Sequence, residues 1–152
     1  MNHLEIKIAL YDKCKQWIAN RRDKVENVIA DIVESLENET KSSAGDKHET
    51  GRAMLQINRE QVGAQLKEIS KIEEALSKVD IKVVSDHVRL GSIVHTDNSS
   101  FFISISAGLL KTKDRSYYAI ALSAPIGQLL LGKKKGDVIR FRENEITITS
   151  VY

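Results

Sequence analysis

The sequence of 152 residues has one cysteine, one proline and few aromatic residues. Because Cys14 stands alone, no internal disulfide and no cysteine metal site can form, which argues against a disulfide-stabilised secreted domain. No run reaches the roughly 18 apolar residues of a membrane span. The first residues include acids and a lysine where a secretory signal would be apolar. We therefore expect a cytoplasmic protein, rich in helix, with no membrane partner.

A large charge of one sign is also lacking. The formal net charge is +2, which is too small to indicate nucleic-acid binding by bulk charge. His3, His87 and His95 show no spacing typical of metal ligands, and His48 is most simply an exposed residue. No tightly bound cofactor and no small-molecule substrate are predicted from these residues.

Two long segments show the apolar spacing of paired helices, with steps of four and three residues. The first runs through Leu4, Ile8, Tyr11, Lys15, Ile18, Arg22, Val25, Ile29, Ile32 and Leu36. The second runs through Leu55, Arg59, Val62, Leu66, Ile69, Glu73 and Leu76. Such seams are typical of helices that pack along their length, and charged residues on them can extend their stems along the seam. The pattern predicts a long antiparallel helical hairpin, a coiled coil, over residues 1–78.

The spacing changes near Val79, where branched residues begin to indicate strands. Strands are expected within 81–83, 88–94, 101–106, 117–122, 138–141 and 145–151. Pro125 is suited to the first turn of a short helix, and Gly132 is suited to its end. The sequence therefore predicts an α+β protein, with a small β-rich domain over residues 79–152 that contains one short helix.

The segment 42–51 separates the two helical patterns and has a glycine near each end. Asp46 and Glu49 are three residues apart, so on a helix their carboxylates are neighbours on one face. Both acids can cap the second helix, because its N-terminus favours negative charge. A binding role is the alternative, and the two roles are compatible.

Two stretches resemble one family. Residues 123–138 read SAPIGQLLLGKKKGDV, and residues 45–49 read GDKHE. The first is similar to a segment of the Gre-type bacterial transcript-cleavage factors, and the second is similar to the acidic tip of those factors. The order of coiled coil, tip, second helix and β-domain also agrees over nearly the whole chain. The resemblance implies that residues 79–152 form an FKBP-like domain.

The resemblance also implies a function. Gre-type factors insert their hairpin into the secondary channel of bacterial RNA polymerase and stimulate cleavage of backtracked RNA by the polymerase itself. This chain would then be no enzyme, but would supply Asp46 and Glu49 as ligands to a Mg²⁺ ion shared with the polymerase. Four basic residues near the tip are candidates for contacts with the nascent RNA backbone: Lys41, Lys47, Arg52 and Arg59. Pro125, Ile126 and Leu129 are candidates for docking on the polymerase, although burial against the sheet is the simpler interpretation.

Two other readings stay open. Residues 50–54 read TGRAM, where the family usually has a further acid and a tyrosine, and Ala124 is an insertion in the second motif. A factor that enters the same channel and inhibits the polymerase without cleavage fits this departure. The third reading is a dimerising coiled coil with no polymerase partner, which Lys15 and Arg22 within the seam disfavour.

Overall fold

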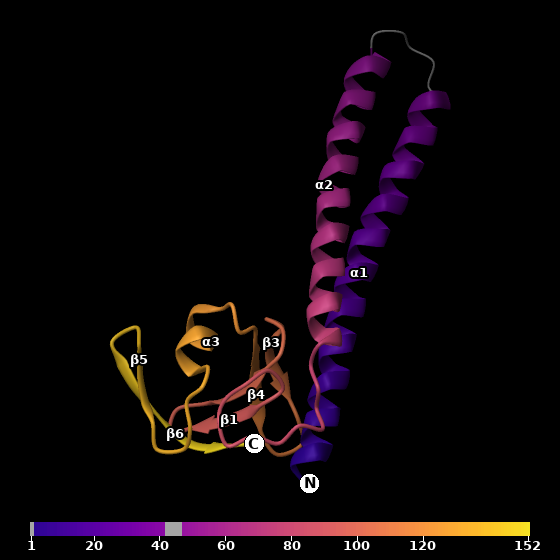
Figure 1. Ribbon diagram of the computed structural model, residues 1–152. Coiled ribbons are helices and arrows are strands. Elements are labelled where there is room, and N and C mark those ends of the chain that lie inside the picture. Colours follow the sequence, from indigo (N-terminus) through magenta and orange to yellow (C-terminus); the bar gives the residue numbers. More distant parts are fainter. Residues whose placement is uncertain (1, 42–46) are drawn as a thin grey trace. The chain divides into compact units, whose positions relative to one another are not determined.

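The computed structural model describes residues 2–41 and 47–152, with side chains for 2–38, 53–54 and 56–152 (Figure 1). The elements in chain order are α1 (His3–Lys41), α2 (Lys47–Ser77), β1 (Ile93–Thr96), β2 (Ser100–Ile103), β3 (Gly108–Lys111), β4 (Ser116–Ile120), α3 (Pro125–Leu130), β5 (Val138–Phe141) and β6 (Asn144–Val151). The α+β class is thus confirmed. The chain forms two compact units: a helical unit, Ile18–Glu73, and a sheet unit, Met1–Trp17 with Glu74–Tyr152.

In the helical unit, α1 and α2 run in opposite directions. The ion pair between Arg22 and Glu73 joins them at one end, and Ile32 lines a groove together with Arg59 farther along. Buried apolar residues occupy the predicted seams: Val25 and Ile32 on α1, and Val62 and Ile69 on α2. At these positions, the spacing of four and three residues correctly predicts which face of each helix is buried. The sequence has no proline or glycine before Gly45, which suits the unbroken length of α1.

The predicted seam is wrong in the first turns of α1. Leu4 and Ile8 are 45% and 44% exposed, whereas Lys7 and Leu10 are buried. These turns belong to the sheet unit, where the ammonium of Lys7 donates a hydrogen bond to the carbonyl of Val83 at 2.9 Å. The face that α1 buries is set here by the residues of the sheet unit, so it departs from the spacing of four and three residues.

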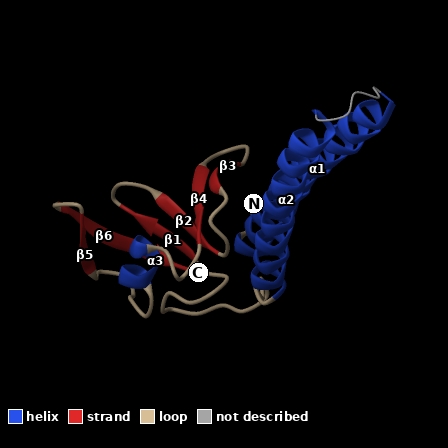
Figure 2. Cartoon of the chain, turned by 90° about the horizontal axis from the view of Figure 1, so that it is seen from above, coloured by secondary structure: helices blue, strands red, loops and turns tan. Residues whose placement is uncertain are grey.

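The sheet unit contains six strands in the order β3-β4-β2-β1-β6-β5 (Figure 2). Neighbouring strands are antiparallel except β2 and β4, which are parallel, with Phe101 beside Tyr118. The β5–β6 hairpin closes through Arg142 and Glu143, whose φ angles are 50° and 68°. Positive φ at both central residues is the geometry of a two-residue type I′ turn. The two strands of this hairpin lie where the sequence predicts strands.

The strand expected over 88–94 is shorter than predicted and begins only at Ile93. Val88 instead exchanges hydrogen bonds with the segment after α3: its amide donates to Lys133 at 2.8 Å, and its carbonyl accepts from Gly132 at 2.9 Å. Gly91 turns the chain with a φ of 93°, and a Cβ there would lie 2.8 Å from the carbonyl oxygen of Asp80. Val88 is therefore buried within a loop, and only the end of the apolar run joins the sheet.

The central strand β2 is buried on both faces. Phe101 and Ile103 belong to the main core cluster together with Leu130 of α3. The alternate residues Phe102 and Ser104 point to the opposite face, where Ser104 Oγ lies 3.7 Å from the Sγ atom of Cys14 on α1. The first turns of α1 thus belong to the core of the sheet unit. The domain division expected at residue 78 stays a prediction.

The short helix α3 lies beside β5 and begins with Pro125, as expected (Figure 1). Gly127 is packed so closely that a Cβ would lie 2.2 Å from the carbonyl oxygen of Ala121. Gly132, with a φ of 78°, follows the helix. Only glycine adopts such a φ without strain, so Gly132 permits the chain to leave the helix. No helix in the described part of the chain is long and apolar enough to cross a membrane.

Candidate functional site

The acidic site predicted from the sequence falls on the connection between α1 and α2. The helix α1 ends at Lys41 and α2 begins at Lys47, so Asp46 directly precedes α2 and Glu49 is in its first turn. Asp46 lies outside the described residues, as do the side chains of Lys41, Lys47, Glu49 and Arg52. The structure therefore fixes where these residues lie along the chain relative to the two helices, and their roles stay predictions.

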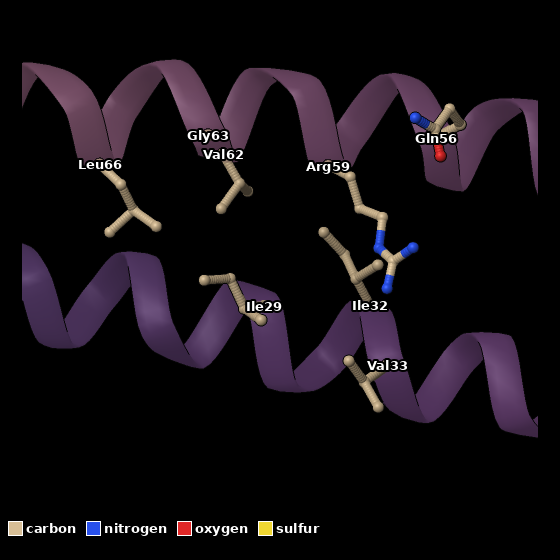
Figure 3. Close-up of a pocket in the computed structure, with 8 residues that line it drawn as sticks. All are labelled: Ile29, Ile32, Val33, Gln56, Arg59, Val62, Gly63 and Leu66. Carbon is tan, nitrogen blue, oxygen red and sulfur yellow. The ribbon is translucent and has the colours of Figure 1, made fainter.

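Arg59 is the one member of the predicted site whose side chain is described. It lines a groove of about 380 Å³ between α1 and α2, within the helical unit. The lining residues are Ile29, Ile32 and Val33 of α1, and Gln56, Arg59, Val62, Gly63 and Leu66 of α2. Figure 3 shows the guanidinium of Arg59 extending beside Ile32, toward the α1 side of the groove. Arg59 therefore occupies a seam position at which an apolar side chain would fill the groove between α1 and α2.

Two features of the sequence produce this groove. Gly63 has no side chain, and a Cβ built there would meet no atom within 4 Å. Arg59 keeps its charged end at the surface while its apolar stem lies along the seam. Val33, on the opposite wall, is 40% exposed. In this groove, the positive charge of Arg59 therefore lies next to apolar side chains of α1 and α2.

The three predicted docking residues do not share one environment. Ile126 is partly buried and packs against the core cluster, so it supports α3 from within. Pro125 is exposed, and Leu129 is 39% exposed. The apolar residues Leu131 and Val138 farther along the chain are 51% and 55% exposed. Pro125 and Leu129 thus remain accessible for docking, whereas the burial of Ile126 agrees with the simpler interpretation.

The described residues contain no group of three or more His, Cys, Asp or Glu placed to hold a metal ion. Cys14 is buried, and burial raises the pKa of its thiol, partly offset by the hydrogen bond with Ser104. A thiol with a raised pKa is a weak nucleophile because the thiolate is the reactive form. Cys14 is therefore a packing residue of the sheet unit.

A comparison with protein-family models finds no match, and a comparison with curated proteins finds none.

Proposed function

We propose that this protein is a Gre-like elongation factor that enters the secondary channel of bacterial RNA polymerase and stimulates cleavage of backtracked RNA. The observation that carries the proposal is the position of the acids. Asp46 and Glu49 lie at the junction of α1 and α2, two long helices that run antiparallel through the helical unit. In this proposal, the helical unit delivers the two acids to the partner.

The dimensions of the helical unit support this role. Residues 18–41 of α1 span about 36 Å at a rise of about 1.5 Å per residue. A pair of helices is about 20 Å across, since each helix with its side chains is about 10–12 Å wide. We propose that the two helices form a coiled-coil hairpin slim enough to enter a channel, and that the sheet unit is FKBP-like. The seam residues Val25, Ile32, Val62 and Ile69 are buried, so within the described part of the helical unit these positions supply no dry surface for a second copy.

The chemistry of the acids suits a shared metal site. Mg²⁺ prefers oxygen ligands and is commonly held by one or two carboxylates together with phosphates, so Asp46 and Glu49 alone would hold it weakly. Beside the polymerase's own metal and the RNA phosphate, the two carboxylates complete a site. In such a two-metal site, one metal would activate water and the other would stabilise the leaving oxygen. The part of this chain is to supply and orient two ligands, so it assists an enzyme without being one.

Basic and apolar side chains complete the proposal. Lys41, Lys47, Arg52 and Arg59 approach the RNA backbone, where each positive charge favours binding by neutralising a phosphate. Of these, Arg59 is held farthest from the acids along the chain. The exposed residues Pro125 and Leu129 dock on the polymerase. Ile126 packs against the core cluster and so holds α3 in place. The nascent RNA and the polymerase are thus the two partners.

One sequence feature favours a second function, inhibition without cleavage. Residues 50–54, TGRAM, lack the acid and the aromatic residue that usually follow the acidic tip in the family. A hairpin that enters the channel without enough of the groups needed for cleavage would block the channel and inhibit the polymerase. Both functions share the same partner, so binding alone does not separate them.

The test uses the full chain, purified core RNA polymerase of the source cell and backtracked complexes with labelled RNA. Asp46→Asn and Glu49→Gln remove the negative charges, and asparagine still caps a helix. Glu68→Gln, an exposed carboxylate farther along α2, is the matched control. We expect all three variants to bind the polymerase as the wild type does. The two tip variants should cleave at least ~10-fold more slowly, the loss that ~1.4 kcal/mol of transition-state stabilisation represents.

Raising the Mg²⁺ concentration should partly restore cleavage in the tip variants if metal occupancy is the defect. Equal cleavage by the wild type and both tip variants would mean that the acids only cap α2. A wild type that suppresses elongation without cleavage would establish the inhibitor. Failure to bind the polymerase at low salt would remove both functions.

A further inference from the structure

The sheet unit has a polar pocket that the proposed function does not use. It has a volume of about 520 Å³, within the range of small-molecule sites. It is lined by His95, Thr96, Asn98, Ser99, Ser100, Leu109, Arg115, Ser116, Tyr118 and Thr149. Because β2 and β4 are parallel neighbours, their first residues, Ser100 and Ser116, lie at the same end of the sheet. The turns before these strands bring Asn98 and Arg115 to that end.

Arg115 is bound to an imidazole in this pocket. Its Nη1 atom lies 2.8 Å from His95 Nδ1, and the hydroxyl of Ser100 lies 2.8 Å from the same nitrogen. An arginine can only donate hydrogen bonds, so Nδ1 of His95 is the acceptor and carries no proton. Burial, together with the charges of Arg115 and His3, lowers the pKa of His95 to about 4. The partner of the guanidinium is therefore a neutral ring at pH 7.

The charge of Arg115 is left without a counter-ion in the described structure. No aspartate or glutamate lines the pocket. Arg115 takes part in none of the ion pairs found in the described part of the chain, such as Arg22–Glu73 and Lys78–Glu74. A guanidinium has five N–H donors, and the bond to His95 leaves others for a ligand. Ser99, Ser116 and Thr149, which have hydroxyl groups, and Asn98, which has an amide, also line the pocket.

We propose that this pocket binds the phosphate group of a small phosphate monoester. The planar fork of an arginine matches the oxygens of a phosphate, and hydroxyl and amide groups donate to the remaining oxygens. A phosphate alone fills only part of the pocket. Leu109 and Tyr118 face each other on β3 and β4 and are 47% and 44% exposed, so they form an apolar wall for the organic part of the ligand.

The proposal concerns the sheet unit alone and is independent of the proposed action on the polymerase. The test is a ¹H–¹⁵N NMR titration of the full chain at pH 7 and constant ionic strength, because chemical shifts report weak binding and its location. The probes are adenosine 5′-monophosphate, inorganic phosphate, adenosine, and a short RNA without terminal phosphates. Arg115→Gln removes the central donor. Arg140→Gln is the matched control, an exposed arginine on β5 at the opposite edge of the sheet from β3.

We expect the monophosphate to shift the amide signals of residues 95–100 and 115–118, and to bind more tightly than inorganic phosphate. Adenosine should bind at least tenfold more weakly than the monophosphate. Arg115→Gln should weaken binding of the monophosphate at least tenfold while its spectrum remains that of a folded protein, and Arg140→Gln should leave binding unchanged. Equal losses in both variants, or equal binding of adenosine, would overturn the proposal. Tighter binding of the RNA, lost in Arg115→Gln, would overturn the assignment to a small molecule.

Discussion

Arg22 of α1 forms an ion pair with Glu73 of α2, so two charged residues that interrupt the apolar seams meet each other. Each stands at a position where the four-and-three spacing calls for an apolar side chain. In an antiparallel pair of helices, charged residues of opposite sign on facing seams can form ion pairs at the surface. Their side chains are 33% and 45% exposed, so solvent weakens the attraction. The pair therefore specifies the alignment of the two helices more than it stabilises them.

The Arg22–Glu73 pair should show a small, salt-dependent coupling. We expect Arg22→Met, Glu73→Gln and the double variant to give a coupling of about 0.2–1 kcal/mol in urea unfolding, as for other exposed pairs. Salt at about 1 M should remove most of it because screening then acts within about 3 Å. The same cycle on Lys24 and Glu73, which form no ion pair, is the control. A coupling that persists in high salt would show that the interaction is not electrostatic.

The same substitution at two glycines should have opposite effects. Gly63→Ala places a methyl group where no atom lies within 4 Å, in the middle of α2. We expect it to raise the free energy of unfolding of the helical unit by about 0.5–1 kcal/mol, since alanine favours helix over glycine. Gly127→Ala places a methyl group against the backbone of Ala121. We expect a loss of about 3 kcal/mol in the sheet unit from this overpacking.

Urea unfolding measures both variants, with circular dichroism reporting the helices and Trp17 fluorescence reporting the sheet unit. A stabilising Gly127→Ala would mean that α3 can move away from the loop at 121–122. A destabilising Gly63→Ala would mean that the groove beside Arg59 must stay open for the helices to pair.

The sheet unit should lose stability in acid because of His95. Its pKa is about 4 in the folded protein and about 6.5 in the unfolded chain, so the unfolded state binds more protons between these values. The contribution of His95 to the free energy of unfolding is fully present above pH 6.5 and is lost as the pH falls toward 4. The full pKa shift corresponds to about 3.4 kcal/mol of unfolding free energy. Because the ring is partly exposed and solvent screens its charge, we expect a loss of about 1–2 kcal/mol. The groups facing His95 are Arg115, His3, Tyr117 and Tyr152.

The measurement is urea unfolding at several pH values from 4 to 8. In His95→Gln, the rise in stability across this window should become shallower. His87→Gln is the control, because His87 is an exposed histidine of the same unit whose ring contacts Asp86. An unchanged slope in His95→Gln would show that another group carries the acid sensitivity.

The sequence predicts a feature well where one local pattern decides it. The seam residues Val25, Ile32, Val62 and Ile69 are buried as the four-and-three spacing indicates. The helix α3 begins at Pro125 because the fixed φ angle of proline suits a first helical turn, and β5 and β6 form where branched residues predict strands. These features depend on neighbours in the chain, so the sequence contains the information directly.

Features set by distant residues could not be foreseen. Lys7 is buried because its ammonium reaches the carbonyl of Val83, far along the chain, and no helical pattern predicts a buried lysine. The strand order, with β2 parallel to β4, likewise follows from packing. The pocket around Arg115 brings His95 and Thr149 together from separate strands, and none of these residues belongs to a motif. The roles of Asp46 and Glu49 rest on the sequence alone.

The two units should be separable, but only with the first turns of α1 kept in the sheet unit. Leu10 and Cys14 are fully buried, and removing a buried apolar side chain costs roughly 1.5–3 kcal/mol. We expect the fragment 79–152 to be at least several kcal/mol less stable than the intact sheet unit, because it also loses the bond from Lys7 to Val83. A shortened chain that replaces residues 18–73 with a Gly/Ser linker should keep that stability. The linker can be about six residues long, since helices in contact lie only about 8–10 Å apart.

Tyr11 supports this design, because its hydroxyl donates to the carbonyl of Leu76 at 3.4 Å and so holds the two cut ends of the helices close together. Urea unfolding compares the fragment, the shortened chain and the full chain. In the transcript assay, the shortened chain should compete with the full chain for the polymerase and stimulate no cleavage, because it lacks Asp46 and Glu49. A fragment 79–152 as stable as the shortened chain would show that the first turns of α1 add nothing to the core. Cleavage stimulated by the shortened chain would place the activity in the sheet unit and remove the acids from the mechanism.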